Sequence, residues 1–308
     1  MKQITNSIMM IKPVGFRYNE QTAVNNYYQQ VLDNLTDEQT QGKALNEFNT
    51  FVDKLRNVGV NVVVIEDTEY PDTPDSIFPN NWVSFHSNAM IGLYPMCAEN
   101  RRDERREDIF DTLVDEYGFT IEGIKDFTEF EEHDKYLEGT GSMVLDHVNM
   151  ICYAAISIRT DEIAVMQFCE EFGYRPICFT ANQDVEGERM EIYHTNVMMC
   201  IANNYSIICL DSIDSLIDKQ IVLKSLEDDN KEIIEINENQ LNSFAGNMIE
   251  LVFQNHSFLI MSSKAYKSLT KNQIKKIEKF SKIVHSSVET IENCGAGSVR
   301  CMIAEVFN

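Results

Sequence analysis

A cysteine near the C-terminus has the surroundings of a candidate nucleophile. Cys301 follows the glycine-containing segment Cys294-Gly295-Ala296-Gly297-Ser298-Val299-Arg300 and opens a short apolar run. Glycine permits close backbone approach and unusual conformations, so a cysteine that enters a strand from such a loop can face the mouth of a cavity. A cysteine taken alone is more often a core thiol than a nucleophile. Cys301 therefore needs partners before it can be assigned a role.

Two other polar residues occupy a similar place in the sequence. His194 stands just before the apolar run Val197-Met198-Met199-Cys200-Ile201, and Glu138 begins the segment Glu138-Gly139-Thr140-Gly141 ahead of another apolar run. A nucleophilic cysteine requires a base and a group that orients that base. Each residue alone is compatible with a capping or surface position. Their shared placement, where an expected strand meets a loop, predicts that Cys301, His194 and Glu138 form one site.

Competing constellations are weaker. His133 and Asp134 lie in the charged run 129–135, which is typical of a solvated face, and Asp146-His147 falls in an expected hairpin turn, where Asp is favoured. The sequence contains no metal-ligand spacing, no P-loop and no GxGxxG motif after a strand. We therefore expect neither a metal nor a cofactor.

Short β-branched runs alternate with helical stretches along the chain. The expected strands are 8–13, 61–66, 82–86, 90–94, 143–145, 150–153, 196–202, 205–210, 248–253 and 257–261. The expected helices are 22–35, 39–58, 101–117, 161–171 and 270–281. Two strands, a helix and a further strand recur at 82–117, 143–171, 196–217 and 248–284, a spacing of roughly 50 to 60 residues that indicates a repeat architecture.

The pattern predicts a single catalytic α/β domain over residues 1–308, built from ββαβ units. No Gly/Ser-rich linker divides the chain, and the charged stretch 218–239 is interpreted as a solvated excursion rather than a boundary.

Charge and hydropathy exclude several classes of partner. A net charge of -23 argues against nucleic acid and against an anionic membrane surface. No stretch approaches the ~20 apolar residues of a transmembrane helix, and residues 1–10 lack an export signal. The eight cysteines form no C-x-x-C pair, so we expect reduced thiols in a cytoplasmic protein. The oligomeric state stays open, a homo-oligomer included.

These residues resemble the guanidino-group-modifying superfamily, whose members include dimethylargininase, arginine deiminase and the amidinotransferases. The acid of Glu138–Gly141, the histidine His194 and the late cysteine Cys301 occur in the family's order, and the resemblance runs nearly end to end. The resemblance implies the pentein fold, a five-bladed α/β propeller of ββαβ modules with a central active site.

Similarity to dimethylargininase implies substrate-binding roles for further residues. Pro74-Asp75-Ser76-Ile77-Phe78 resembles the segment whose aspartate holds the substrate's guanidinium, and the two acids that follow in that enzyme fall here on Asn80 and Asn81. The Arg101-Arg102 pair and the segment Ser157-Ile158-Arg159-Thr160 resemble the segments that bind the α-carboxylate, which implies this role for Arg101 and Arg159. Arg101 also fits a solvated helix N-terminus within a dense charge run.

Departures from the family pattern point to the substrate. Asn80 and Asn81 replace acids, and Asn196 stands where arginine deiminases carry an aspartate. Amides offer both donors and acceptors, which suits a neutral ureido group better than a cationic guanidinium. The segments FPNNWVSFH, LEGTGSMV and FAGNMIEL also resemble those of citrulline-utilisation hydrolases, or citrulline ureidases. The expected reaction is cleavage of L-citrulline, a small-molecule amino acid, to ornithine, CO₂ and ammonia.

Three alternatives remain open at this point. A deiminase or dimethylargininase would release citrulline from an arginine derivative, an amidinotransferase would need an amine acceptor, and a non-enzymatic pentein-fold binding protein would not turn over any substrate. Residues 17–26, with Asn19, Asn25 and Asn26, are compatible with a lid over the substrate and equally with a helix cap.

Overall fold

Strands from both ends of the chain form the first sheet of the computed structural model, which describes residues 2–307. The strand β1 (Ser7–Lys12) lies between β17 (Ala304–Val306), to which it is antiparallel, and β2 (Asn61–Glu66), to which it is parallel. The helices α1 (Glu20–Ala23) and α2 (Asp37–Asn57) connect β1 to β2.

Four further three-stranded sheets repeat this strand pattern, each from one continuous stretch of chain. The second unit contains η1 (Pro79–Asn81), β3 (Val83–Phe85), β4 (Met90–Leu93), α3 (Glu99–Arg102), α4 (Asp108–Asp115) and β5 (Gly123–Asp126). The third contains η2 (Thr128–His133), α5 (Gly139–Ser142), β6 (Met143–Asp146), β7 (Ile151–Ala155), α6 (Glu162–Phe172) and β8 (Arg175–Phe179).

The fourth and fifth units follow the same order. The fourth contains α7 (Thr195–Met198), β11 (Met199–Ile201), β12 (Tyr205–Ile208), η3 (Leu210–Ser212), α8 (Leu216–Asp228) and β13 (Glu232–Glu235). The fifth contains α9 (Glu238–Leu241), β14 (Ile249–Phe253), β15 (His256–Ser262), α10 (Ser263–Ser268), α11 (Lys271–Ile277) and β16 (Lys282–Ser286). The hairpin of β9 (Asn182–Val185) and β10 (Glu188–Glu191) precedes the fourth unit, and α12 (Glu289–Gly295) precedes β17.

Every unit has the same internal geometry. The first strand pairs antiparallel with the middle strand, and the third strand returns parallel to the middle one after a helical connection. A strand with the usual right-handed twist, followed by a helix, returns to the same sheet as a parallel strand. Each unit therefore contains one such strand–helix–strand connection, between its middle and third strands. The predicted mixed α/β fold of repeated ββαβ units is therefore present in these small sheets.

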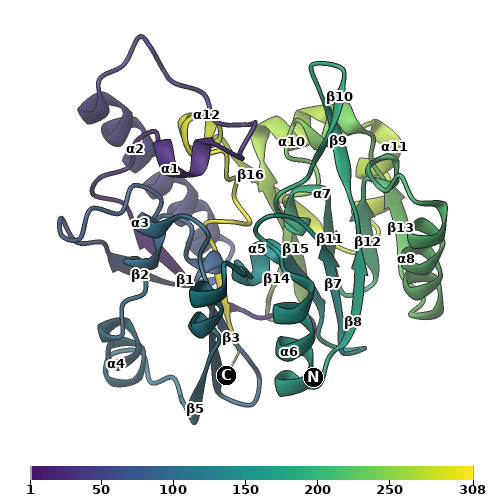
Figure 1. The fold of residues 1–308 in the computed structure, drawn as a ribbon, viewed down its shortest axis with the longest axis horizontal. Coiled ribbons are helices and arrows are strands. Elements are labelled where there is room, and N and C mark those ends of the chain that lie inside the picture. The colour runs from purple at the N-terminus through teal and green to yellow at the C-terminus, as the bar shows by residue number, and fades with distance from the viewer. Residues whose placement is uncertain (1, 308) are drawn as a thin grey trace.

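First strands and the short turns before them lie toward the middle of the molecule. β17 contacts β3, and β11 contacts both β6 and β14, while α5 contacts both η1 and α7. Figure 1 shows α5 near the middle of the molecule and α2, α4 and α8 at its periphery. Buried apolar side chains fill four clusters between these elements.

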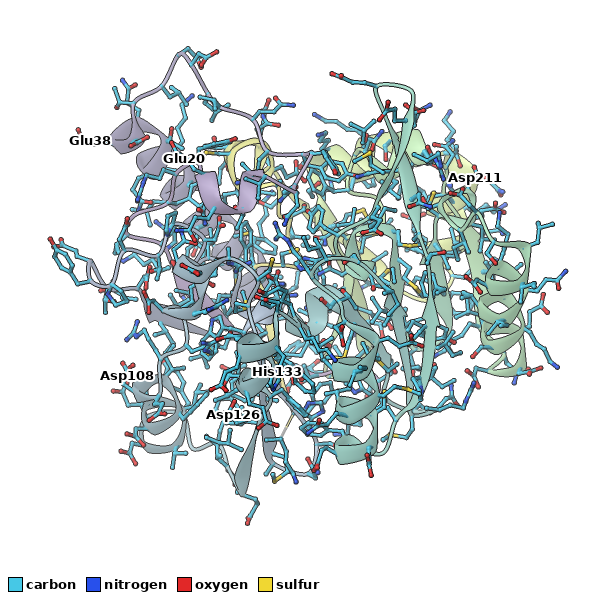
Figure 2. The ribbon with its side chains drawn as sticks, in the orientation of Figure 1. Glu20, Glu38, Asp108, Asp126, His133 and Asp211 are labelled. Atoms are coloured by element: carbon cyan, nitrogen blue, oxygen red, sulfur yellow. The ribbon has the colours of Figure 1, made fainter. Side chains whose placement is uncertain are left out.

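Charged side chains cover the outside. Glu38, Asp108, Asp126 and Asp211, labelled in Figure 2, are exposed. His133 is exposed as well, in agreement with the solvated face expected there. Within the described part of the chain, none of the helices combines the length and apolar character that a membrane crossing requires.

Several expected elements were wrong. The helix expected over 22–35 is only the single turn α1, because the asparagine and glutamine side chains after it bond to distant parts of the protein. The helix expected over 101–117 is split into α3 and α4, because Glu104 in the intervening stretch pairs with Arg101 of α3 and Arg105 pairs with Glu131. The stretch 218–239 is not an excursion, since it supplies α8 and β13 of the fourth unit.

Candidate active site

Residues that precede the first strand of four of the three-stranded sheets converge on one buried centre. Asn80 and Asn81 precede β3, Glu138 precedes β6, and His194 precedes β11, while Cys301 lies before β17. All five side chains belong to residues that are buried in the protein. The sequence placed Cys301 at the start of a strand, whereas it lies in a turn three residues before β17 and its N–H donates to Ser298 O at 3.0 Å.

Glu138 and His194 form a hydrogen-bonded pair. His194 Nε2 lies 2.7 Å from Glu138 Oε2, and the other carboxylate oxygen accepts from the N–H of Cys97 at 3.0 Å. Burial alone would raise the pKa of Glu138, but Arg159, His194 and Arg101 together lower it well below its usual range. Arg159 Nη1 and Arg101 Nη1 lie 3.5 and 3.9 Å from Oε2. The carboxylate is therefore ionised and fixes the imidazole.

His194 is held as a neutral imidazole. Burial lowers its pKa below 6.5 and outweighs the opposing effect of Glu138, while Arg159 and Arg101 lower it further. An ionised Glu138 accepts the Nε2–H, which leaves Nδ1 unprotonated. Nδ1 lies beside Gly141, where an added Cβ would stand 2.9 Å from Nδ1 and 2.3 Å from Asn81 Nδ2. Nδ1 is thus the nitrogen available for proton transfer.

Two amides face the Cys301 sulfur. Asn247 Nδ2 donates to Sγ at 3.2 Å. Asn196 Nδ2 donates to Sγ at 3.5 Å, and the thiol in turn lies 3.9 Å from Asn196 Oδ1, to which it can donate. Asn247 also donates to Asn196 O at 3.1 Å and accepts from the N–H of Arg300 at 3.1 Å, so its amide orientation is fixed. Sequence reasoning missed Asn247. Its place ahead of β14, directly after Gly246, is the same signal that identified Glu138 and His194.

Three polar atoms of the expected substrate-binding residues lack partners. Asp75 Oδ1, Asn80 Oδ1 and Asn81 Nδ2 are buried without a hydrogen bond. Asp75 Oδ2, in contrast, accepts from Asn19 Nδ2 at 2.8 Å and from Thr22 Oγ1 at 3.1 Å. Unpaired buried groups are costly in a folded protein, and a bound ligand commonly satisfies them.

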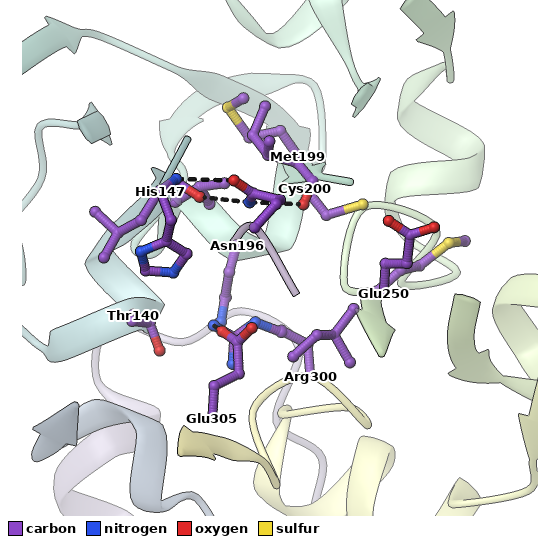
Figure 3. A pocket seen from close by; sticks show the side chains of 14 residues that line it. Thr140, His147, Asn196, Met199, Cys200, Glu250, Arg300 and Glu305 are labelled. Atoms are coloured by element: carbon purple, nitrogen blue, oxygen red, sulfur yellow. Dashed lines mark hydrogen bonds and ion pairs between the residues drawn. The ribbon is translucent and has the colours of Figure 1, made fainter. Parts of the chain in front are cut away.

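A small cavity borders the site at Asn196. It measures about 30 Å³, enough for a water molecule or two, and Thr140 and Asn196 form part of its wall (Figure 3). His147, Glu250 and Arg300 also line it. Asn196 thus separates the sulfur from a polar interior cavity.

Arg101 and Arg159 are both buried and both already bonded. Arg101 forms a two-point ion pair with Glu104 at 2.8 and 2.9 Å and donates to Asn81 Oδ1 at 2.9 Å. Glu104 was not singled out from the sequence. Arg159 donates to Asn25 Oδ1, with a distance of 2.9 Å from its Nε, and to a backbone carbonyl, and its guanidinium lies 5.0 Å from the centre of the Tyr193 ring.

The segment 19–30 covers this centre. Asn19 and Thr22 bond to Asp75, and Asn25 bonds to Arg159. Farther along, Gln29 Nε2 donates to Cys294 O at 3.1 Å, and the Tyr28 hydroxyl bonds to Gln183. Asn19 and Asn25 therefore contact site residues, as a lid would, and Asn19 also caps α1.

No group of three or more His, Cys, Asp or Glu side chains among residues 2–307 is arranged to hold a metal ion. All eight cysteines are free thiols.

Comparisons with known proteins agree with this arrangement. The family model described as "N,N dimethylarginine dimethylhydrolase, eukaryotic" matches residues 12–308. A substrate-bound cysteine-to-serine mutant of the N-terminal domain of ArgZ, a cyanobacterial arginine dihydrolase, superimposes with a TM-score of 0.74 at 15% identity and covers 98% of both chains. A mutant of dimethylarginine dimethylaminohydrolase, in an adduct with S-methyl-L-thiocitrulline, gives 0.65 at 17% identity, over 98% of this chain and 99% of that one.

A third structure, an ArgZ N-terminal domain with an asparagine-to-serine change, is covalently bound to a reaction intermediate; its TM-score is 0.74 at 16% identity over 97% of each chain. No curated protein matches the chain. The fold and the family match place the protein in the guanidino-group-modifying superfamily, a class that contains hydrolytic enzymes. Within it, the chain belongs to the N,N-dimethylarginine dimethylhydrolase family. The resemblance noted in the sequence is thereby confirmed at the level of the superfamily.

Proposed function

We propose that the protein is a cysteine hydrolase that cleaves the ureido C–N bond of L-citrulline, releasing ornithine, CO₂ and ammonia. The observation that carries this proposal is the mixture of unpaired atoms in the site. Asp75 Oδ1 and Asn80 Oδ1 are acceptors, whereas Asn81 Nδ2 is a donor. A ureido group has N–H donors and a carbonyl acceptor, so it can satisfy all three.

A guanidinium cannot satisfy the donor. All of its polar hydrogens donate, so Asn81 Nδ2 would stay buried and unpaired at a cost of about 1–3 kcal/mol. The amides around the sulfur, Asn196 and Asn247, add further donors rather than the carboxylates that a cation attracts. The amides that surround the reacting group therefore favour a neutral ureido group over a guanidinium.

The proposed reaction runs through a carbamoyl-enzyme. His194 Nδ1 takes the proton of the Cys301 thiol, and the thiolate attacks the ureido carbon. The bond from that carbon to the δ-nitrogen breaks as His194 returns the proton to the departing amine, which leaves as ornithine. Cys301 then carries an S-carbamoyl group.

Water completes the cycle. His194 Nδ1 removes a proton from water, the resulting hydroxide attacks the carbamoyl carbon, and the thiolate leaves and recovers the proton. Carbamate is released and decays to CO₂ and ammonia. Glu138 orients the imidazole through Nε2, and the amides of Asn196 and Asn247 stabilise the thiolate and the charge that develops next to it.

Asp75, Asn80 and Asn81 would hold the ureido group, and Arg159 would bind the α-carboxylate once Asn25 yields its place. Arg101 was assigned the same carboxylate role from the sequence. We further propose that residues 1–308 are one catalytic domain of a cytoplasmic enzyme, that the five sheets are the five blades of a propeller around this site, and that the reaction needs no cofactor.

An amidinohydrolase acting on an arginine derivative is the second candidate. The free oxygen of Asp75 suits a guanidinium, the family model is described by a methylated arginine, and ArgZ is described as an arginine dihydrolase. A binding protein without turnover is disfavoured because Cys301, His194 and Glu138 supply the thiol, the imidazole and the carboxylate that a hydrolytic site requires.

Product analysis decides between these functions. The protein is incubated with citrulline, arginine, methylarginines and agmatine, and ornithine, citrulline and ammonia are quantified. Ornithine formed from citrulline is expected, whereas citrulline formed from arginine, without ornithine, would overturn the proposal. Cys301→Ser should abolish turnover, and full activity in that variant would refute the nucleophile. A wild-type protein inactive on the whole panel would favour the binding function.

A further inference from the structure

We infer that Arg101 is a positioning residue: together with Glu104 it holds the Asn81 amide with its N–H₂ toward the reacting group, and it does not bind the substrate's α-carboxylate. This inference rests on the proposed function, because it explains how the site comes to present a donor to a ureido oxygen.

Every edge of the Arg101 guanidinium is already occupied. Nε and Nη2 donate to the two oxygens of Glu104 at 2.8 and 2.9 Å, and Nη1 donates to Asn81 Oδ1 at 2.9 Å. Nη2 also lies 3.4 Å from Phe78 O. The side chain of Arg101 is 3% exposed and that of Glu104 is 1% exposed, which leaves a substrate no open face of the guanidinium to approach.

Displacing Glu104 would be unfavourable. A substrate carboxylate that took its place would leave the Glu104 carboxylate buried without its partner, and removing one member of a buried ion pair is strongly destabilising. Burial alone would lower the pKa of Arg101, but Glu104 more than compensates and raises it. The pair is thus a fixed part of the protein.

The Arg101–Glu104 pair fixes which atom of the Asn81 amide faces Arg101 and which faces the substrate. A guanidinium can only donate hydrogen bonds, so the Asn81 atom that faces Arg101 must be the carbonyl oxygen. The Nδ2 group then points away from Arg101, beside Gly141 and His194, and is buried without a partner. An aspartate at this position would bond to Arg101 more strongly, through a charge-assisted hydrogen bond, but would present an acceptor to the substrate. Residue 81, oriented by Arg101, therefore selects between a ureido oxygen and a guanidinium nitrogen.

A double-mutant cycle tests the link between Glu104 and Asn81. Glu104→Gln removes the charge that holds Arg101 without contacting the substrate, and we expect kcat/KM for citrulline to fall on the order of 10²-fold because the amide is misplaced. In the Asn81→Ala background the same change should have little further effect, since coupled residues are non-additive. Additive losses would overturn the inference.

A titration with ornithine separates positioning from carboxylate binding. Ornithine carries the α-carboxylate but no ureido group, so calorimetry should give the same Kd for wild type and for Arg101→Lys. If Arg101 gripped the carboxylate, the ornithine affinity would fall together with citrulline turnover, and the inference would be wrong. Should Glu104→Gln fail to fold, Arg101→Lys replaces it in the cycle with Asn81→Ala.

A matched control comes from a neighbouring ion pair. Glu131 accepts from Arg105 through both oxygens, with an Nη2–Oε2 distance of 3.1 Å, and lies outside the catalytic centre. Glu131→Gln should leave kcat/KM unchanged even if it lowers stability. If the wild type converts arginine instead of citrulline, the proposed function fails, but the same cycle with arginine and the ornithine titration still decide the role of Arg101.

Discussion

The assignment of Cys301 as the nucleophile depends on the residues that contact its sulfur more than on its position in the sequence. By itself it is a buried free thiol, like several other cysteines of the protein. The two amide groups that donate to its sulfur distinguish it, and Asn247 makes the shorter of these contacts. Asn247 is also anchored to Asn196 O and to the N–H of Arg300, so its donor is held in place before substrate arrives.

Loss of Asn247 should therefore reduce catalysis without unfolding the protein. We expect Asn247→Ala to lower kcat/KM on the order of 10²-fold, the effect of removing one preorganised donor. Alkylation of Cys301 by iodoacetamide, followed by mass spectrometry, should also slow at neutral pH because the thiolate loses a hydrogen bond. Asn203→Ala, on an exposed side chain, is the control. Equal activity in both variants would remove Asn247 from the site.

The protonation state of His194 predicts the acid limb of the pH profile. Neutral His194 is needed to take the thiol proton, and its pKa lies below 6.5, so kcat/KM should fall as the pH drops through that lower value. Glu138 raises the pKa of His194, so Glu138→Gln should move the limb to still lower pH and reduce the plateau. A limb that moves upward in Glu138→Gln would contradict this assignment.

At the level of elements, one rule places the site. Each three-stranded sheet has a polar residue shortly before its first strand, and η1, α5 and α7 bring three of these segments into contact. The segments approach so closely that Gly141 has no room for a side chain: a Cβ there would lie 2.3 Å from Asn81 Nδ2.

Gly141→Ala should consequently inactivate the enzyme. The methyl group would push Asn81 and His194 away from the reacting carbon, and a displacement of about 1 Å can cost on the order of 10²-fold in rate. Gly42→Ala is the matched control, because nothing lies within 4 Å of its added Cβ inside α2. That change should leave activity intact and stabilise the protein by about 0.5–1 kcal/mol, measured by chemical denaturation. Full activity in Gly141→Ala would mean that the two segments are not tightly fitted.

The same rule explains how far the sequence could predict the structure. Glu138, His194 and Cys301 were found because each combines a reactive side chain with a strand entrance, and the structure brings Glu138 and His194 into direct contact. Asn247 also lies just before a first strand but was missed, since an amide side chain is neither a nucleophile nor an acid or base and so is not recognised as a candidate catalytic group. The non-helical segment after α1 could not be foreseen, because Asn25 leaves the helical pattern to bond to Arg159, 134 residues away.

At the scale of the whole molecule, two buried histidines, His86 and His147, lie where units of the fold meet and take no part in the proposed active site. Burial and repulsion from His147 lower the pKa of His86 to about 3, and burial, together with Arg300, lowers that of His147 to about 4. The His147 ring bonds to the Tyr174 hydroxyl through Nδ1 at 2.6 Å and packs against Phe307, while its backbone N–H donates to Gln3 Oε1. His147 thus joins the third unit to segments near both chain ends.

These histidines should make the protein lose stability in mild acid. The unfolded chain binds a proton at each histidine near pH 6.5, whereas the folded protein resists protonation of His147 down to about pH 4. Stability from this group is therefore complete above pH 6.5, is lost as the pH falls toward 4, and changes no further below that. The full shift in the pKa of His147 corresponds to roughly 3 kcal/mol of unfolding free energy.

His147→Gln, which cannot titrate, should show a shallower fall in unfolding free energy between pH 7 and pH 4, measured by urea denaturation. His133→Gln, at an exposed site, should retain the wild-type slope, and identical slopes in all three proteins would exclude His147 as a source of acid sensitivity.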